Sequence, residues 1–121
     1  LRGTRDIDNS LESFAENKQE SQISFFKYGW MNPWWAHVIN NNVPSALFKK
    51  SIKERSQDLE NLYCPTGAIW ICKPDILKTH KTFYSPNYRA EKINWISAMD
   101  IDDLEDLEMA ETLFKMRGDI L

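Results

Sequence analysis

One stretch, residues 97–111, constrains the fold of this chain more than any other. It contains Asp100 and Asp102, two carboxylates separated by one residue, at a change in the hydrophobic pattern. Residues 91–96 are rich in β-branched and aromatic side chains, which predicts a strand. Over residues 104–116 apolar side chains recur at steps of three and four, which predicts a helix. Acidic side chains are thus expected at the carboxyl end of a strand, where open α/β sheets bind ligands.

Two interpretations of this acidic stretch are open from the pattern alone. An Asp-x-Asp pair can hold Mg²⁺, which takes one or two carboxylates and completes its coordination with water and substrate phosphates. Alternatively, Asp102 and Glu105 have the spacing of a capping box, and acids in the first turn of a helix complement its dipole. Seven of the twelve residues from Asp100 to Glu111 are acidic. Because acidic helix starts are commoner than metal sites, the pattern by itself favours the structural interpretation.

The bulk composition narrows the classes of protein. The 121 residues suffice for one domain, with 42% hydrophobic and 27% charged residues. A net charge of -3 provides no basic surface for nucleic acid, and no apolar run is long enough to span a membrane. Two cysteines and two histidines indicate neither a disulfide framework nor a zinc site, so we expect a cytoplasmic protein. The five tryptophans predict a large apolar surface that a second domain or subunit covers.

Helix and strand patterns alternate along the rest of the chain, with one irregular segment. Residues 45–58 are polar and poorly periodic, so a long loop or arm is expected there. Gly118 is suited to end the final helix. The other elements expected are a helix capped by Thr4 that ends near Lys18, strands over residues 22–28, 34–39 and 68–72, a turn over 40–42, a helix from Pro74 to Leu77 and a loop over 83–87. This order predicts an α/β fold with mixed strand directions.

Several other side chains have both a functional and a structural interpretation. Arg55 can bind an anionic substrate in a bidentate manner, although surface loops often have the composition of its segment. Phe83 and Tyr84 can line a pocket or simply fill space. His37 and His80 have no partner at the spacing of a metal site or a catalytic triad. No glycine-rich phosphate-binding loop occurs in the sequence.

Taken together, several segments resemble the acylneuraminate cytidylyltransferases, also called CMP-sialic acid synthetases. They are Leu1-Arg2 with Asp6-Ile7-Asp8, Asn32-Pro33-Trp34-Trp35, Ser56-Gln57-Asp58-Leu59 with Tyr63 and Thr66-Gly67-Ala68-Ile69-Trp70-Ile71, and Asp100-Ile101-Asp102 with Asp106 and Ala110-Glu111. Their order and spacing are similar to those of the family over essentially all 121 residues. The resemblance implies a nucleotide-diphospho-sugar-transferase-like (Rossmann-like) mixed sheet flanked by helices, with an inserted dimerisation arm, of which this chain is the C-terminal part.

The resemblance also implies an activity, the transfer of CMP from CTP to a nonulosonic (sialic-type) sugar acid with release of pyrophosphate. Asp100 and Asp102 would then hold the catalytic Mg²⁺, and one of them is a candidate to assist deprotonation of the attacking hydroxyl. The implied substrate-binding residues are Arg55, Gln57, Trp70, Phe83 and Tyr84. Arg2 would lie at the edge of the nucleotide site. With the resemblance, the metal interpretation of the two aspartates overtakes the capping interpretation, and the two are compatible.

The resemblance divides the chain into three segments. Residues 1–27 and 63–121 would belong to the nucleotidyltransferase core, the second of them with the Asp-x-Asp motif and the C-terminal helix. Residues 28–62 would form a dimerisation arm whose loops reach the partner's active site. A homodimer that binds CTP and a nonulosonic acid, and neither nucleic acid nor a membrane, is therefore expected.

Departures from the family pattern keep other functions open. Ser56 stands where the family has an arginine, Thr66 replaces an asparagine and Trp70 replaces a tyrosine. A related sugar acid, such as legionaminic, pseudaminic or 3-deoxy-octulosonic acid, is therefore an alternative substrate. The family's N-terminal phosphate-binding segment has no counterpart in these residues, so we expect this chain alone to be inactive. A non-catalytic dimerisation or binding module of the same fold is the alternative from another class.

Overall fold

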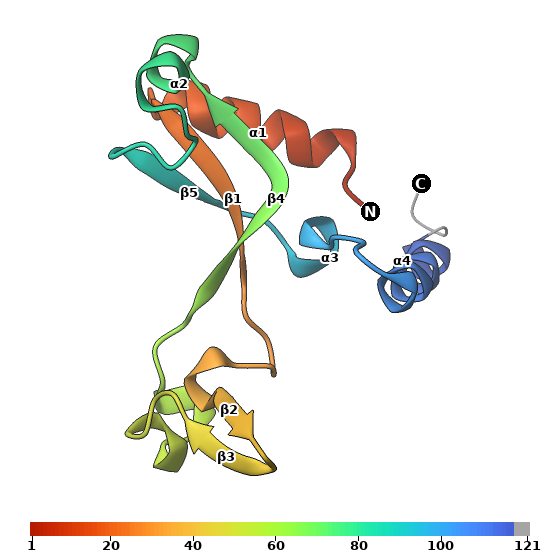
Figure 1. The fold of residues 1–121 in the computed structure, drawn as a ribbon. Helices are drawn as coiled ribbons and strands as arrows, with labels where there is room; N and C mark the ends of the chain where they lie inside the picture. Colours follow the sequence, from red (N-terminus) through yellow and green to blue (C-terminus); the bar gives the residue numbers. More distant parts are fainter. Residues whose placement is uncertain (118–121) are drawn as a thin grey trace. The chain divides into compact units, whose positions relative to one another are not determined.

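The computed structural model describes residues 1–117 and separates into two compact units (Figure 1). The first unit consists of Leu1–Phe26 and the chain from Pro65 onward, and the second consists of Lys27–Cys64. The described elements are, in chain order, α1 (Thr4–Glu16), β1 (Ser21–Lys27), the 3₁₀ helix η1 (Pro33–Trp35), β2 (His37–Asn40), β3 (Val43–Ala46), the 3₁₀ helices η2 (Ser51–Lys53) and η3 (Ser56–Asp58), β4 (Tyr63–Cys72), α2 (Pro74–His80), β5 (Tyr88–Lys92), α3 (Trp95–Ala98) and α4 (Leu104–Arg117). None of the described helices is long and apolar enough to cross a membrane.

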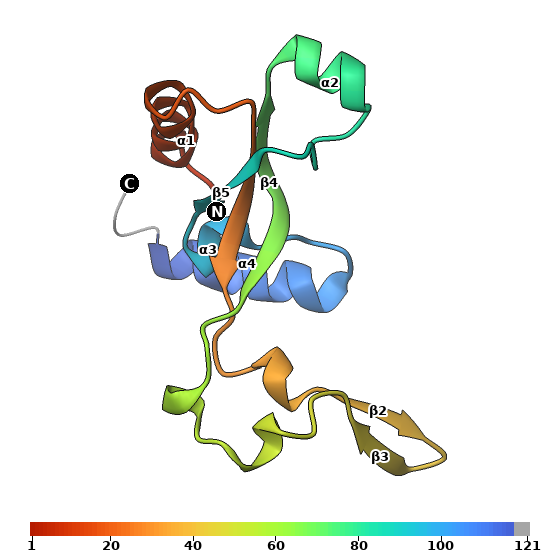
Figure 2. The same cartoon turned by 90° about the vertical axis from the view of Figure 1, so that its left-hand side faces the viewer.

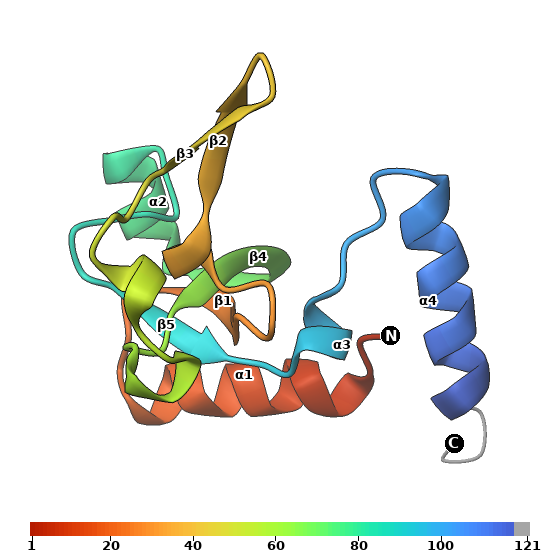
Figure 3. The same cartoon turned by 90° about the horizontal axis from the view of Figure 1, so that it is seen from below.

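The first unit is built on a three-stranded mixed sheet with the strand order β4-β1-β5. β1 pairs with β5 in parallel, with Ile23 opposite Ala90, and runs in the direction opposite to β4 (Figure 1). α1 lies along one face of this sheet, as Figures 2 and 3 show. There the Gln22 amide donates to the Ser10 carbonyl over 2.9 Å. The mixed α/β class that the sequence predicts is confirmed.

Most of the buried side chains of the first unit are polar. The buried hydrophobic residues among those described are Ile23, Ala98 and Ala110. The buried polar residues of this unit are Ser10, Ser21, Gln22, Ser24, Thr66, Ser85 and Ser97. Ser24 illustrates why such burial is tolerated, since its hydroxyl donates to the Thr66 carbonyl and accepts from the Ile69 amide, each over 3.0 Å. Hydrogen-bonded polar groups avoid most of the desolvation penalty of entering the interior.

The second unit contains an antiparallel hairpin of β2 and β3, in which Asn40 pairs with Val43. The loop residues Asn41 and Asn42 have φ values of 49° and 63°. Positive φ at both positions matches a two-residue hairpin turn, and asparagine tolerates this conformation better than most residues. The turn expected at residues 40–42 is thereby confirmed. The loop expected over residues 45–58 is wrong at its start, since Ser45 and Ala46 belong to β3, but after Ala46 the chain up to β4 contains two short 3₁₀ helices and is otherwise irregular.

Two predicted strands are wrong or misplaced, in each case because an asparagine caps a short helix. Residues 91–96 do not form one strand, since β5 ends at Lys92 and the Asn94 side chain accepts from the Ser97 amide over 2.9 Å, which begins α3. Trp34 and Trp35 lie in η1 and not in a strand, since the Asn32 side chain accepts from the Trp34 amide over 3.0 Å. Side-chain capping by asparagine competes with the extended conformation.

The other predicted elements hold, with changes at their ends. α1 begins at Thr4, but Gly3 and not Thr4 is its N-cap, and the Asp6 carboxylate accepts from the Gly3 amide over 2.9 Å. The strand expected over 68–72 extends back to Tyr63, and the helix that Pro74 begins continues to His80. Residues 83–87 form a loop as predicted. Gly118 lies outside the described residues.

Candidate functional site

The two aspartates of the Asp-x-Asp motif lie in the segment Met99–Asp103 between α3 and α4, here called the acid turn. Both side chains are exposed. One Asp100 carboxylate oxygen, Oδ1, accepts from the Ile101 amide over 3.2 Å. The other, Oδ2, faces β4, where it lies 4.0 Å from the position that a Cβ atom on Gly67 would occupy. The acid turn therefore follows a short helix, and not a strand as expected, but still lies against the sheet.

Side chains from two distant segments hold the backbone that enters the acid turn. The Arg2 guanidinium donates through Nη1 to the Ser97 and Met99 carbonyls, over 3.3 and 3.4 Å. The Thr66 hydroxyl of β4 donates to the Ala98 carbonyl between them, over 2.9 Å. These three carbonyls lie at the C-terminal end of α3, where a helix leaves its carbonyl groups without intrahelical partners. External donors are thus the natural way to satisfy them.

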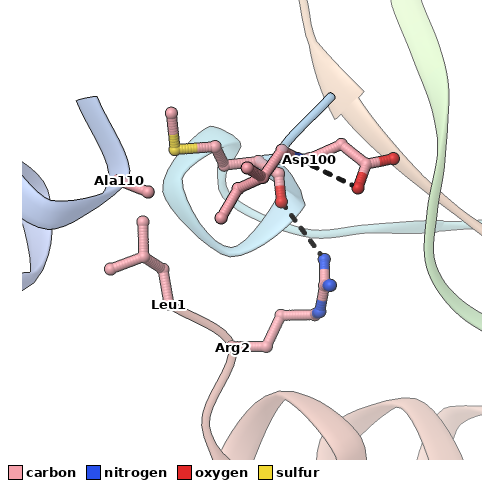
Figure 4. Close-up of a pocket in the computed structure, with 6 residues that line it drawn as sticks. Leu1, Arg2, Asp100 and Ala110 are labelled. Carbon is pink, nitrogen blue, oxygen red and sulfur yellow. Dashed lines mark hydrogen bonds between the residues drawn. The ribbon is translucent and has the colours of Figure 1, made fainter. Parts of the chain in front are cut away.

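A small pocket of about 170 Å³ lies beside the acid turn. Figure 4 shows it between the N-terminal residues and the start of the turn, with the Arg2 guanidinium directed at the backbone next to Asp100. The residues that line it are Leu1, Arg2, Met99, Asp100, Ile101 and Ala110. The pocket therefore combines one cation and one carboxylate with an apolar wall.

Asp103, and not Asp102, caps α4. The Asp103 carboxylate accepts from the Asp106 amide over 2.9 Å, and the Asp106 carboxylate accepts in return from the Asp103 amide over 3.3 Å. This reciprocal pair is the capping-box arrangement, moved by one residue from the expected Asp102 and Glu105. In the part of the chain that the structure describes, the Asp102 carboxylate has no hydrogen-bond partner. Capping therefore does not occupy either aspartate of the Asp-x-Asp motif.

The carboxylates of the acid turn suit Mg²⁺ in their chemistry but do not form a closed cage. Among residues 1–117, no group of three or more histidine, cysteine, aspartate or glutamate side chains is placed to hold a metal ion. Mg²⁺ in nucleotide-binding enzymes is commonly held by one or two carboxylates together with water and substrate phosphates. Asp100 and Asp102 match that donor set, with hard oxygen atoms on an exposed turn.

An aromatic cluster forms a second candidate surface in the first unit. The Trp70 ring centroid lies 5.3 Å from that of Phe83 and 5.7 Å from that of Tyr84, which in turn lies 5.4 Å from Tyr88. Trp70, Tyr84 and Tyr88 keep 40%, 45% and 38% of their surfaces exposed. The predicted set of Trp70, Phe83 and Tyr84 is therefore brought together, and Tyr88 joins it. Tyr88, which follows Tyr84 by four residues across a proline, was not predicted from the sequence pattern.

The remaining predicted substrate residues, Arg55 and Gln57, lie in the second unit. Gln57 is exposed within η3, and Arg55 immediately precedes that helix. The Arg55 guanidinium forms an ion pair with Asp58, with Nε 2.9 Å from Oδ2. Both partners are largely exposed, so this pair contributes little to stability, and a carboxylate substrate can compete for the guanidinium. The predicted substrate residues are thus distributed over both units.

A tyrosine and a cysteine, neither assigned a role by the sequence, interact in the second unit. The Tyr28 amide donates to the Leu62 carbonyl over 3.0 Å, which joins the two chain segments at the ends of this unit. A side-chain hydrogen bond with Cys64 raises the pKa of Tyr28, and partial burial and the charge of Cys64 act in the same direction. Removing a proton from Tyr28 is therefore disfavoured in the folded chain.

No protein-family model matches the chain, and a search of the curated proteins finds no match. The family resemblance therefore rests on the motifs in the sequence alone.

Proposed function

We propose that this chain is the C-terminal portion of a cytidylyltransferase that transfers CMP from CTP to a nonulosonic, sialic-type sugar acid and releases pyrophosphate. Its sheet would be part of a nucleotide-diphospho-sugar-transferase-like fold. Residues 28–62 would serve as the arm of a homodimer. The fold class supports this proposal at the coarse level, as a mixed sheet flanked by helices.

One observation carries the proposal, which is that three motifs distant in the sequence meet around the acid turn. Arg2 of the first motif donates to the Ser97 and Met99 carbonyls, next to Asp100. Thr66, in the motif that includes Gly67, donates to the Ala98 carbonyl, and one Asp100 carboxylate oxygen lies 4.0 Å from where a Cβ on Gly67 would be. Motifs that resemble one family by chance have no reason to converge on one turn. Their convergence supports the interpretation that they form one site.

The chemistry proposed for this site is distributed over a few side chains. Asp100 and Asp102 would hold Mg²⁺, which neutralises phosphate charge and positions the attacking sugar hydroxyl when it is bound. The Arg2 guanidinium would attract the triphosphate or the sugar carboxylate beside the acid turn. The exposed faces of Trp70 and Tyr84 would stack against the apolar face of the sugar ring.

The test compares the chain with Asp100→Asn, a variant of the same size that lacks the charge. Pyrophosphate release is measured with CTP, Mg²⁺ and a panel of sialic, legionaminic, pseudaminic and 3-deoxy-octulosonic acids. Binding of the same acids in the presence of Mn²⁺ is measured by equilibrium dialysis, because binding does not require a complete phosphate site. We expect Mn²⁺-dependent binding of at least one acid, which Asp100→Asn abolishes.

Asp103→Asn serves as the matched control, because it changes a neighbouring aspartate that caps α4. It should leave the Mn²⁺-dependent binding within about twofold of the unmodified chain, since asparagine also accepts the capping hydrogen bond and Asp103 is not a proposed metal ligand. Failure of every acid to bind, or equal binding by Asp100→Asn, would contradict the proposal. The acid that binds most tightly identifies the substrate class. It thereby shows which acid is preferred by a chain with Trp70 and Thr66 at the positions that depart from the family pattern.

A second candidate, a non-catalytic dimerisation module, is favoured by the exposed apolar hairpin of the second unit. Val38, Ile39 and Val43 on its two strands are 45%, 66% and 66% exposed. Sedimentation equilibrium should report a dimer of the chain, and Ile39→Lys should shift the mass to that of the monomer. A dimer that binds neither Mn²⁺ nor any sugar acid would favour the module over the enzyme. A monomer at all concentrations would remove the dimer from both candidates.

A further inference from the structure

The entry into the acid turn has three consecutive carbonyls that all accept hydrogen bonds from outside their own helix. The Ser97 and Met99 carbonyls accept from Arg2, and the Ala98 carbonyl accepts from Thr66. The α3 helix has four residues, so almost all of its stability must come from contacts with other elements. Contacts that fix these carbonyls therefore also fix the position of the next residue, Asp100.

Thr66 is built into its position from two sides. It is 8% exposed, and its carbonyl accepts from the Ser24 hydroxyl of the central strand over 3.0 Å. The same carbonyl accepts from the Trp70 indole over 2.7 Å, which joins it to the aromatic cluster. A single threonine thus connects the central strand, the aromatic cluster and the backbone before the acid turn. Buried networks of this kind restrict the conformations of the groups that they join.

Ser97, one of the three residues at this entry, has a second link to α1. Its hydroxyl donates to the Asp6 carboxylate over 3.0 Å, and the same carboxylate oxygen accepts from the Gly3 amide. Because Gly3 follows Arg2, this link also places the start of the chain beside α3. The link from Gly3 through Asp6 to Ser97 therefore keeps the Arg2 guanidinium within reach of the Ser97 and Met99 carbonyls.

We propose that Thr66 and Arg2 are positioning residues that fix the acid turn, so that the Asp100 carboxylate is directed to one place before any ligand binds. Thr66 acts through the Ala98 carbonyl, and Arg2 acts through the Ser97 and Met99 carbonyls. Neither side chain has to touch the metal for this role. The effect that we infer on metal binding rests on the proposed function. The effect on the order of the acid turn does not.

The first measurement is amide hydrogen exchange of Ile101, whose amide donates to the Asp100 carboxylate, and of Asp102 and Asp103, whose amides donate to the Asp106 carboxylate of α4. Thr66→Val keeps the shape of the side chain and removes the hydroxyl, whereas Thr66→Ser keeps the hydroxyl. We expect Thr66→Val to speed exchange of these amides about tenfold, which corresponds to the loss of one buried hydrogen bond. Thr66→Ser should stay within about threefold of the unmodified chain, since its hydrogen bond is retained.

Thr79→Val is the matched control, since it removes a hydroxyl that donates to the Asp75 carbonyl within α2, away from the acid turn. If Thr66→Val unfolds the chain, the pair Arg2→Leu and Arg5→Leu replaces it. Arg2 and Arg5 are both exposed, and of the two only Arg2 donates a hydrogen bond to α3 among the described residues. Arg2→Leu should speed exchange of the turn, and Arg5→Leu should not. Equal exchange in Thr66→Val and Thr79→Val, or in the two arginine variants, would overturn the inference.

The second measurement is Mn²⁺ binding, followed by the electron paramagnetic resonance signal of the free ion. We expect Thr66→Val to weaken binding about tenfold, as is common when a residue behind a metal ligand is removed, and Thr66→Ser to restore most of it. A chain that binds no Mn²⁺ would contradict the proposed function, and hydrogen exchange would still decide the role of Thr66. Normal exchange of the turn in Thr66→Val would overturn the inference even in a chain that binds Mn²⁺.

Discussion

In the first unit, buried hydroxyl groups of serine and threonine connect one element to the next, whereas in the second unit two exposed or half-buried indoles do so. Ser24 joins β1 to β4, and Thr66 joins β4 to α3. In the second unit, Trp34 donates to the Glu60 carbonyl over 2.9 Å and Trp35 donates to the Ser51 carbonyl over 3.2 Å. A hydroxyl links elements through its hydrogen bond alone, whereas an indole adds a large apolar ring to the hydrogen bond that it donates.

The two units also differ in what they bury. Within residues 27–64 the only buried side chain is Ser51, and the Trp34 ring packs edge-on against Phe48 with centroids 5.2 Å apart. The first unit buries Ile23 completely in its central strand. The first unit orders its candidate site through polar contacts around a small core. The second unit has little core, and a few aromatic contacts hold its segments together. Burial of the exposed hairpin against a second surface would add to the stability of the second unit.

The largest effect that we predict is on the core of the first unit. Ile23→Ala should lower the free energy of unfolding by about 2–5 kcal/mol, because it opens a cavity where the surrounding strands cannot collapse. Urea denaturation followed by circular dichroism measures this change. At concentrations where the chain is monomeric, Ile39→Ala on the exposed hairpin should stay within about 0.5 kcal/mol. A large loss for Ile39→Ala would instead indicate that a second copy covers the hairpin.

The next effect concerns the indole contacts of the second unit. Trp34→Phe retains an aromatic ring but removes the hydrogen bond to the Glu60 carbonyl, at a net cost of about 0.5–1.5 kcal/mol, since the exposed carbonyl then binds water. Hydrogen exchange should rise over residues 28–62 and remain unchanged in β1. Trp30, which is 86% exposed, provides the control through Trp30→Phe. Faster exchange throughout the first unit would show that the two units do not unfold separately.

A smaller effect separates capping from metal binding within the acid turn. Asp103→Ala should destabilise the chain by about 1 kcal/mol, because it removes the N-cap of α4. Asp102→Ala should leave stability nearly unchanged and lower the affinity for Mn²⁺. Thermal unfolding and Mn²⁺ titration of both variants measure the two properties independently. If the two variants exchange these effects, Asp102 is the cap and the metal assignment of the pair fails.

The smallest effect is on a titration in the second unit. Cys64→Ala should lower the pKa of Tyr28 toward its ordinary value, because the side-chain hydrogen bond that raises it is lost. The raised pKa stabilises the folded chain at pH values below the ordinary tyrosine value, and this contribution disappears as pH rises through the folded value. Absorbance at the tyrosinate band should therefore show one of the four tyrosines titrating earlier in the variant. Unchanged titration would mean that Cys64 does not set this pKa.

Much of the fold follows from local signals in the sequence. The spacing of Ile7, Leu11 and Phe14 predicts α1, and Pro74 marks the start of α2. The asparagine run correctly predicts a turn at residues 40–42, although not the strand β3 that makes it a hairpin. Each of these signals acts over a few residues, so it needs no knowledge of distant contacts.

The errors arose where a side-chain cap competed with a hydrophobic pattern. Trp95 and Ile96 have strand-forming side chains, but the Asn94 cap turns them into α3. The spacing pattern predicts the capping box of α4 one residue too early, because Asp102 and Asp103 have the same side chain and the pattern does not separate them. In both cases the alternatives differ little in local free energy, and packing of the following helix decides between them.

The sequence by itself determined the alternation of helices and strands, the hairpin turn and the acidic pair, because these depend on short-range periodicity and on turn chemistry. Only the tertiary structure brought Arg2, Thr66 and Gly67 to the acid turn, and Tyr88 to the aromatic cluster. Such contacts join residues that are up to 97 positions apart. They depend on how the strands pair and on which backbone polar groups still lack a hydrogen-bond partner when α3 packs against the sheet. No local sequence pattern encodes either of these.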